Sequence, residues 1–369
     1  MTGRPISPPD ASIDPARGAD NLLIHCAGVR AGDSVLVVRE PVGAGHYEDS
    51  LPDFIAQRAR LLGAAVTILA EPLGLGPEDC PEAVIAAMAG ADHTIFLSRI
   101  GDQIRFQPLP GAGSKTMVYA LDAEHLGSLF ATLPYALLET LHDRLVDRLA
   151  EAGAYRIRDD DGSELVMTLE PRRERRANSF TVKNFPVMVI PPISAAGLSG
   201  RLKLTHALTS TYIHVYEESV LPLTSPVWLT LEDGAIIGFE GEPALVAEVR
   251  AQFERVAGLL GGEALRVNSW HVGINPGVFF SKPALSDIDR WSAVAFGSPR
   301  YTHFHMCGSA PGDICGQMFD PVIAFDDEVV WDRGRLLFFD RPENQSLLAD
   351  FGLTPSALQT RPDIGLPHV

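Results

Sequence analysis

The stretch SVLVVREPVGAGHYEDSLPDFIAQRARLLGAAVTILAE, residues 34–71, decides the fold expected for the N-terminal half. It opens with SVLVVRE, a continuous apolar run that predicts a buried strand. Residues 49–63 have helical spacing, with Ser50 as a candidate N-cap and Gly63 just after the end. The apolar face predicted for this helix consists of Leu51, Phe54, Ile55, Leu61 and Leu62. A second strand over residues 65–71 completes a strand–helix–strand unit, which predicts parallel pairing.

The same alternation continues to about residue 155. A helix over 81–91, strands over 93–100 and 116–122 and a long helix over roughly 134–152 are expected. Residues 21–155 are therefore predicted to form a doubly wound α/β domain with a mostly parallel sheet. The preceding residues 1–20 are rich in proline and aspartate and are predicted to be a flexible leader.

Residues 156–369 have a different pattern. VWLTLEDGAIIGFEG and VIAFDDEVVWDRGRLLFF alternate like antiparallel hairpins, with turns at EDG and DDE. One helix is expected over residues 242–262, with Pro243 in its first turn and Gly261 near its end. This half is predicted to be an α+β domain.

Composition limits the classes of function. The chain has 30 Lys and Arg against 47 Asp and Glu, a formal net charge of −17, so nucleic acid and anionic membranes are not expected partners. The N-terminus has no apolar core typical of a signal peptide, and no run of about 18 apolar residues occurs. Four cysteines in 369 residues do not predict a disulfide scaffold, so a reduced, cytoplasmic protein is expected. GxGxxG, GxxxxGK[ST], GxSxG and HExxH motifs are absent, which removes the usual support for nucleotide binding and serine hydrolysis.

Three histidines are the main candidates for metal ligands. His271 lies in the glycine-containing segment NSWHVGINPG, and His303 and His305 lie in YTHFHMCG. In an extended segment, side chains two residues apart point to the same face, so His303 and His305 can share one metal ion. The alternative for each is an ordinary structural or loop histidine without a ligand.

Other polar residues near these segments are weaker candidates. Asp313 offers a carboxylate, the usual third partner of two histidines around iron, but aspartate after glycine also forms turns. Cys307 and Cys315 are either thiolate ligands or small buried apolar residues. Glu170 is a candidate catalytic base in a cleft.

Segments spread over most of the chain resemble the 2,5-dihydroxypyridine 5,6-dioxygenases. These are mononuclear non-haem iron enzymes with the fold of the thermophilic-type aminopeptidases. The likeness is carried by AVTILAEP, WLTLEDGAIIGFEG, HVGINPG and PGDICGQMFDPVIAFDDEVV. The resemblance implies that His271 is a metal ligand. The family's second ligand motif, His-x-Asp, is Asp313-Ile-Cys315 here, and its substrate-side histidine is Asn184. The resemblance also implies a homo-oligomer.

Because one ligand histidine is lost and two are gained nearby, we expect a relocated site of His271, His303 and His305, with Asp313 as a further ligand. Three functions remain open. The first is an Fe²⁺-dependent oxygenase acting on a small aromatic or heteroaromatic metabolite. The second is a Zn²⁺-dependent hydrolase of peptidase or amidase type, with Asp313 or Glu170 as the base. The third is a non-metal enzyme that uses the same cleft.

Overall fold

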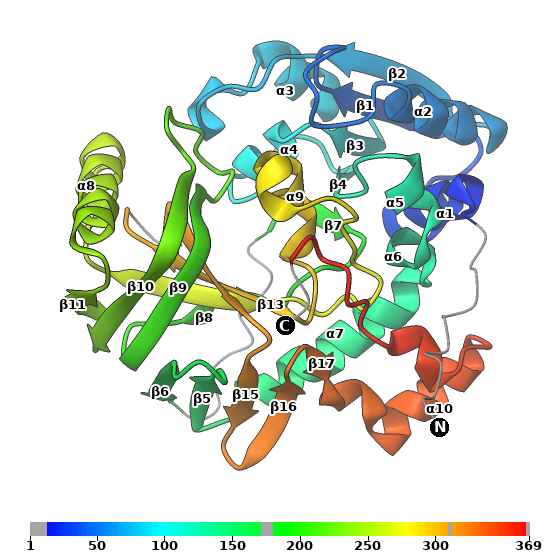
Figure 1. Ribbon diagram of the computed structural model, residues 1–369. Helices are drawn as coiled ribbons and strands as arrows, with labels where there is room; N and C mark the ends of the chain where they lie inside the picture. The colour runs from blue at the N-terminus through cyan, green and yellow to red at the C-terminus, as the bar shows by residue number, and fades with distance from the viewer. Residues whose placement is uncertain (1–12, 171–179, 309–311, 367–369) are drawn as a thin grey trace.

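The computed structural model describes residues 13–170, 180–308 and 312–366. Within them the chain forms a parallel sheet covered by helices and a larger, mostly antiparallel sheet (Figure 1). The parallel sheet lies at the top of the view, and the long strands of the second sheet lie at the left and across the centre. The protein is thus of mixed α/β architecture, as the sequence indicated in general terms.

The parallel sheet has the strand order β2-β1-β3-β4-β7. Its strands are β2 (Ala65–Ala70), β1 (Ser34–Arg39), β3 (His93–Leu97), β4 (Ser114–Val118) and β7 (Lys183–Phe185). β1 is buried over Val35–Arg39 because it has neighbours on both sides, whereas β2 is the edge strand and alternates in exposure. β7 lies beyond the predicted boundary at residue 155, yet it pairs with β4. The sheet therefore includes a segment from the C-terminal half of the sequence.

Helices connect and cover these strands. They are α1 (Pro15–Asp20), α2 (Leu51–Leu61), α3 (Glu82–Ala89), α4 (Ile100–Ile104), α5 (Ala123–Gly127), α6 (Leu129–Thr132) and α7 (Tyr135–Ala150). Ser50 is the residue before α2 as expected, but its hydroxyl donates to Glu48 instead of capping the helix. Leu51 and Ile55 are buried, but Leu61 is 69% exposed because it lies on the solvent side of the last turn.

Part of the predicted leader lies within the described residues and forms a helix. Residues 15–20 form α1, and Asn21–Ala27 continue it as a wider π-helical segment. The Asn21 amide donates to the carbonyls of Ala131 and Leu133, which anchors this segment to the rest of the chain. Residues 1–12 lie outside the described residues. The predicted boundary between residues 155 and 156 stays a prediction.

The second sheet has the order β17-β16-β15-β5-β6-β9-β14-β13-β12-β8, with β10 on β9 and β11 on β10. Its strands are β5 (Ala154–Arg158), β6 (Glu164–Thr168), β8 (Ile193–Ser194), β9 (Ser199–Ser210), β10 (Leu221–Glu232), β11 (Ala235–Glu240), β12 (Val267–Val272), β13 (Tyr301–Met306), β14 (Ile314–Phe319), β15 (Val322–Phe325), β16 (Glu328–Asp332) and β17 (Arg335–Leu336). The hairpins predicted at EDG and DDE are confirmed as β10–β11 and β15–β16.

The α-helices among the described residues of this half are α8 (Pro243–Leu260), α9 (Ile288–Ala295) and α10 (Pro342–Asp350). α8 matches its prediction at both ends, with Pro243 at the start and Gly261 in the left-handed conformation after it. No described helix has both the length and the apolar character that a membrane crossing requires. All four cysteines are free.

Candidate metal centre

The three candidate histidines meet on two neighbouring strands. β12 and β13 are antiparallel, with His271 opposite His303 and Ser269 opposite His305. The His271 and His303 rings are stacked with their centroids 5.0 Å apart, and the His305 ring lies 4.9 Å from each. One nitrogen from each ring lies within 4.8 Å of the others, and all three side chains are buried. The expectation that His303 and His305 share one face is confirmed, because residues two apart on a strand point the same way.

Hydrogen bonds leave imidazole nitrogens available for a metal ion. His271 Nδ1 donates to the carbonyl of Ile190 at 2.9 Å, so its Nε2 carries the lone pair. His303 Nδ1 is buried and has no hydrogen-bond partner among the described residues. Such unpartnered buried nitrogens cost free energy unless a ligand satisfies them. The donor set therefore fits a metal ion.

Burial also keeps the imidazoles neutral. It lowers the pKa of His271 to about 4, and it lowers the pKa of His303 and His305 well below the usual 6.5. A neutral imidazole is the form that binds metals, since protonation removes the lone pair. Near pH 7 the three rings are in the form that binds a metal ion.

Glycine brings the strand that carries His271 close to its neighbours. A Cβ at Gly273 would lie 2.2 Å from the carbonyl oxygen of Ser298, which leaves no room for a larger residue. Gly277 approaches the backbone of Phe130 equally closely, with a Cβ there 2.5 Å from the Phe130 nitrogen. The glycines of HVGINPG thus permit tight backbone packing, as the sequence suggested.

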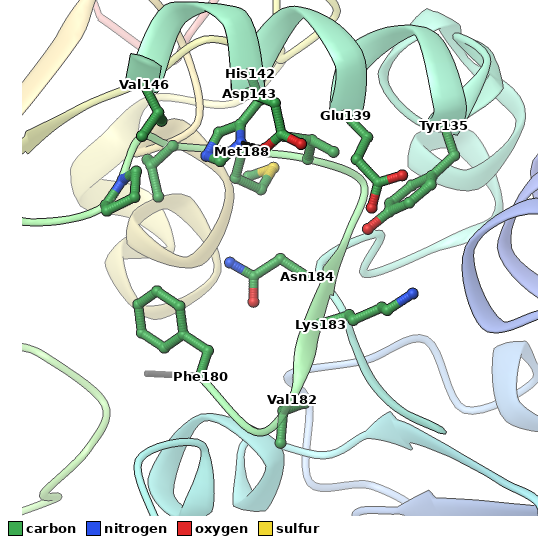
Figure 2. Close-up of a pocket in the computed structure, with 13 residues that line it drawn as sticks. Tyr135, Glu139, His142, Asp143, Val146, Phe180, Val182, Lys183, Asn184 and Met188 are labelled. Carbon is green, nitrogen blue, oxygen red and sulfur yellow. Dashed lines mark hydrogen bonds and ion pairs between the residues drawn. The ribbon is translucent and has the colours of Figure 1, made fainter. Parts of the chain in front are cut away.

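The histidines line a small cavity. It has about 60 Å³ of space for the centres of water-sized molecules. Its other polar or titratable lining residues are Asp102, Arg105, Tyr119, Asn184, Thr209, Ser210, Thr211, Tyr212, Ser292, Tyr301 and Cys315. A larger cavity of about 440 Å³ adjoins it and shares Phe180, Asn184 and Val189. Figure 2 shows the Asn184 amide inside the larger cavity, with Phe180 on one side and the side chains of α7 across from it.

Asn184, which the resemblance places on the substrate side, thus lines the same cavity as the histidines. It comes from β7, whose pairing with β4 carries this residue of the C-terminal half to the cavity. Cys315 is also in the lining, and its Sγ lies 3.8 Å from His305 Nδ1. Cys307, in contrast, donates to the carbonyl of Phe253 at 3.1 Å and does not line the cavity.

Asp313 and Glu170 are not brought to the histidines. Asp313 lies two residues before Cys315, and its carboxylate pairs with His214 Nδ1 at 3.0 Å. The Asp313 amide donates to the carbonyls of Met306 and Cys307, which holds Asp313 just before β14. Glu170 is exposed and is absent from the lining of both cavities. Among the described residues, the ligand group therefore consists of three imidazoles without a carboxylate.

Sequence reasoning missed Asp102, Arg105 and Tyr119. Asp102 and Arg105 belong to the segment SRIGDQIR, which follows β3, and Tyr119 directly follows β4. In open parallel sheets, ligands bind beyond the carboxyl ends of the strands. That rule, applied to the predicted strands, would have directed attention to these residues.

Comparison with known proteins agrees with this architecture. The solved structure of 2,5-dihydroxypyridine dioxygenase from Pseudomonas putida KT2440 superimposes with a TM-score of 0.54. The match covers 89% of this chain and 98% of that one, at 15% sequence identity. No family model and no curated protein matches this sequence. The chain therefore shares the fold of that dioxygenase.

Proposed function

We propose that His271, His303 and His305 bind one Fe²⁺ ion and that the protein is an oxygenase. Its substrate would be a small aromatic or heteroaromatic metabolite, or a related compound. The observation that carries the proposal is the buried group of three imidazoles, with ligating nitrogens within 4.8 Å of one another. The shared fold with a dioxygenase supports it. Iron held by three protein ligands would supply the chemistry of O₂ activation.

The surrounding residues have separate tasks in this proposal. Ile190 fixes the tautomer of His271 through its carbonyl, which orients the ring. The buried lining excludes bulk water from the imidazoles. Asn184, shared by both cavities, is placed to orient a substrate that enters from the larger one.

A zinc hydrolase is the second candidate, because three neutral imidazoles suit Zn²⁺ as well as Fe²⁺. This reaction also needs a base near the metal-bound water. Neither Asp313 nor Glu170 lines the cavity, so both bases expected from the sequence lie away from it. A non-metal enzyme built on Asp313, Cys315 and His271 has the same difficulty, because Asp313 does not line the cavity.

Metal analysis of anaerobically purified protein tests the proposal. We expect about one iron per chain in the wild type and a loss of iron in His303→Ala and His305→Ala. Oxygen consumption with hydroxylated pyridines and phenols then tests the oxygenase. Bound zinc without oxygen uptake would favour the hydrolase. No bound metal, and no gain of metal on addition of Fe²⁺ or Zn²⁺, would overturn both metal proposals.

A further inference from the structure

A partly buried arginine, Arg105, lies in the same cavity as the histidines. Arg105 directly follows α4, and its Nη1 donates to Asp102 at 2.6 Å and to the Tyr119 hydroxyl at 3.3 Å. Tyr119 also donates to the same Asp102 oxygen, at 2.7 Å. Asp102 therefore receives both donors on one oxygen and does not form a two-point pair with the guanidinium.

Part of the guanidinium remains available to a ligand. Arg105 Nε is buried and has no hydrogen-bond partner among the described residues. Arginine carries five N–H donors in a planar fork that matches a carboxylate. A buried donor without a partner costs free energy, which a bound acceptor would recover.

The arginine is held in position from several sides. Its guanidinium carbon lies 5.1 Å from the centre of the Phe106 ring and 5.5 Å from that of Phe180. Its carbonyl accepts from the Thr181 amide at 2.8 Å. Cation–π contacts of this kind favour one orientation of the guanidinium. The fork is therefore preorganised instead of being a mobile surface charge.

Arg105 lines the same cavity as His271, His303 and His305. The guanidinium and the candidate metal site therefore border one space. A ligand between them would contact both.

The charges around the cavity do not compensate a divalent ion. Asp102 is the one carboxylate in the described lining, and Arg105 cancels its charge. Imidazoles that bind a metal ion are neutral. With a divalent ion bound, the described lining would carry a net charge of about +2 in a buried site, where uncompensated charge is unfavourable.

We infer that this cavity binds a small carboxylate, whose oxygens accept hydrogen bonds from Arg105 while the same ligand faces the three histidines. The inference rests on the proposed metal site and narrows its substrate class to carboxylic acids. The space near the histidines holds about four water molecules, enough for a carboxylate group and a few further atoms. The body of a larger acid would extend past Asn184 into the adjoining cavity.

The test compares benzoate with benzamide, which has nearly the same shape but no charge. Binding of each to Zn²⁺-loaded protein is measured by titration calorimetry, for wild type, Arg105→Gln and Arg105→Lys. Arg148→Gln is the control, because Arg148 is also a partly buried arginine that pairs with a carboxylate, Glu328, and lines neither cavity. Zinc affinity and far-ultraviolet circular dichroism are recorded for every variant.

We expect wild type to bind benzoate at least tenfold more tightly than benzamide. Arg105→Gln should weaken benzoate binding about 10- to 100-fold, as expected for loss of a charged hydrogen bond, with Arg105→Lys in between. Arg148→Gln should bind benzoate like wild type. Equal binding of benzoate and benzamide by wild type would overturn the inference, whatever the variants do. So would unchanged benzoate binding in a folded Arg105→Gln protein.

The two proposals fail in different ways. If zinc binds but benzoate shows no preference, the carboxylate inference falls and the metal site stands. If zinc does not bind, the metal proposal falls, and the benzoate titration is repeated on metal-free protein. If metal-free protein prefers benzoate and the preference depends on Arg105, the anion site stands without the metal. If metal-free protein shows no such preference, the anion site is overturned as well.

Discussion

Replacement of His303 by alanine should remove most of the affinity for a metal ion. His303 lies on β13 opposite His271 and contributes one of the three nitrogens of the group. Zinc sites with four protein ligands bind with about 10–16 kcal/mol, or about 3–4 kcal/mol per ligand. Loss of one ligand of three should therefore raise the Kd for Zn²⁺ about 100- to 1,000-fold.

A competition titration against a coloured chelator measures this change directly. His25→Ala is the control, because His25 is an exposed histidine that takes no part in the group. Its Kd for Zn²⁺ should equal that of wild type. Circular dichroism of the metal-free proteins separates loss of a ligand from loss of the fold. A folded His303→Ala protein with wild-type affinity for zinc would refute the assignment of His303 as a ligand.

Three further predictions concern residues outside the ligand group. Burial alone would raise the pKa of Asp122, but its interactions with His125 and Arg290 outweigh burial and lower that pKa. The ionised carboxylate therefore stabilises the fold above about pH 5, and this stability is lost as the pH falls. Asp122→Asn should thus lower the melting temperature at pH 7 and have a smaller effect at pH 3; an equal loss at both would contradict the linkage. The side chain of the fully buried Asn275 makes three hydrogen bonds to backbone groups. Asn275→Ala should therefore lower the free energy of unfolding, measured with urea, by about 3 kcal/mol, and a decrease below about 1 kcal/mol would refute this reasoning. Cys315→Ser should leave the Kd for Zn²⁺ within about threefold of wild type, because the thiol lies outside the ligand group; a large loss of affinity would make the sulfur a ligand.

Local sequence patterns predicted many of the elements. The apolar run predicts β1, and a proline and a glycine predict the two ends of α8. Each of these signals depends only on residues close together in the sequence. His303 and His305 are two residues apart, so they share one face if their segment is a strand, as it is. Leu61 was placed wrongly in the core because the end of a helix can face solvent whatever its apolar residues suggest.

Asp313 and Asn184 mark the limits of such reasoning. Asp313 is eight residues from His305, near enough to suggest a shared metal, but its carboxylate pairs with His214. Asn184 reaches the cavity because β7 joins the parallel sheet from beyond the predicted boundary. Neither outcome is visible in spacing, because each depends on which strands pair.

By itself, the sequence determined the types of element, the antiparallel hairpins and the common face of His303 and His305, because these follow from periods and turns within short segments. Only the tertiary structure decided that His271 joins them, that no described carboxylate does, and that Arg105 faces the same cavity. The cavity brings together residues as much as 200 positions apart, Arg105 and His305. Such contacts are decided by strand pairing and by burial, which belong to the whole chain and not to any one segment.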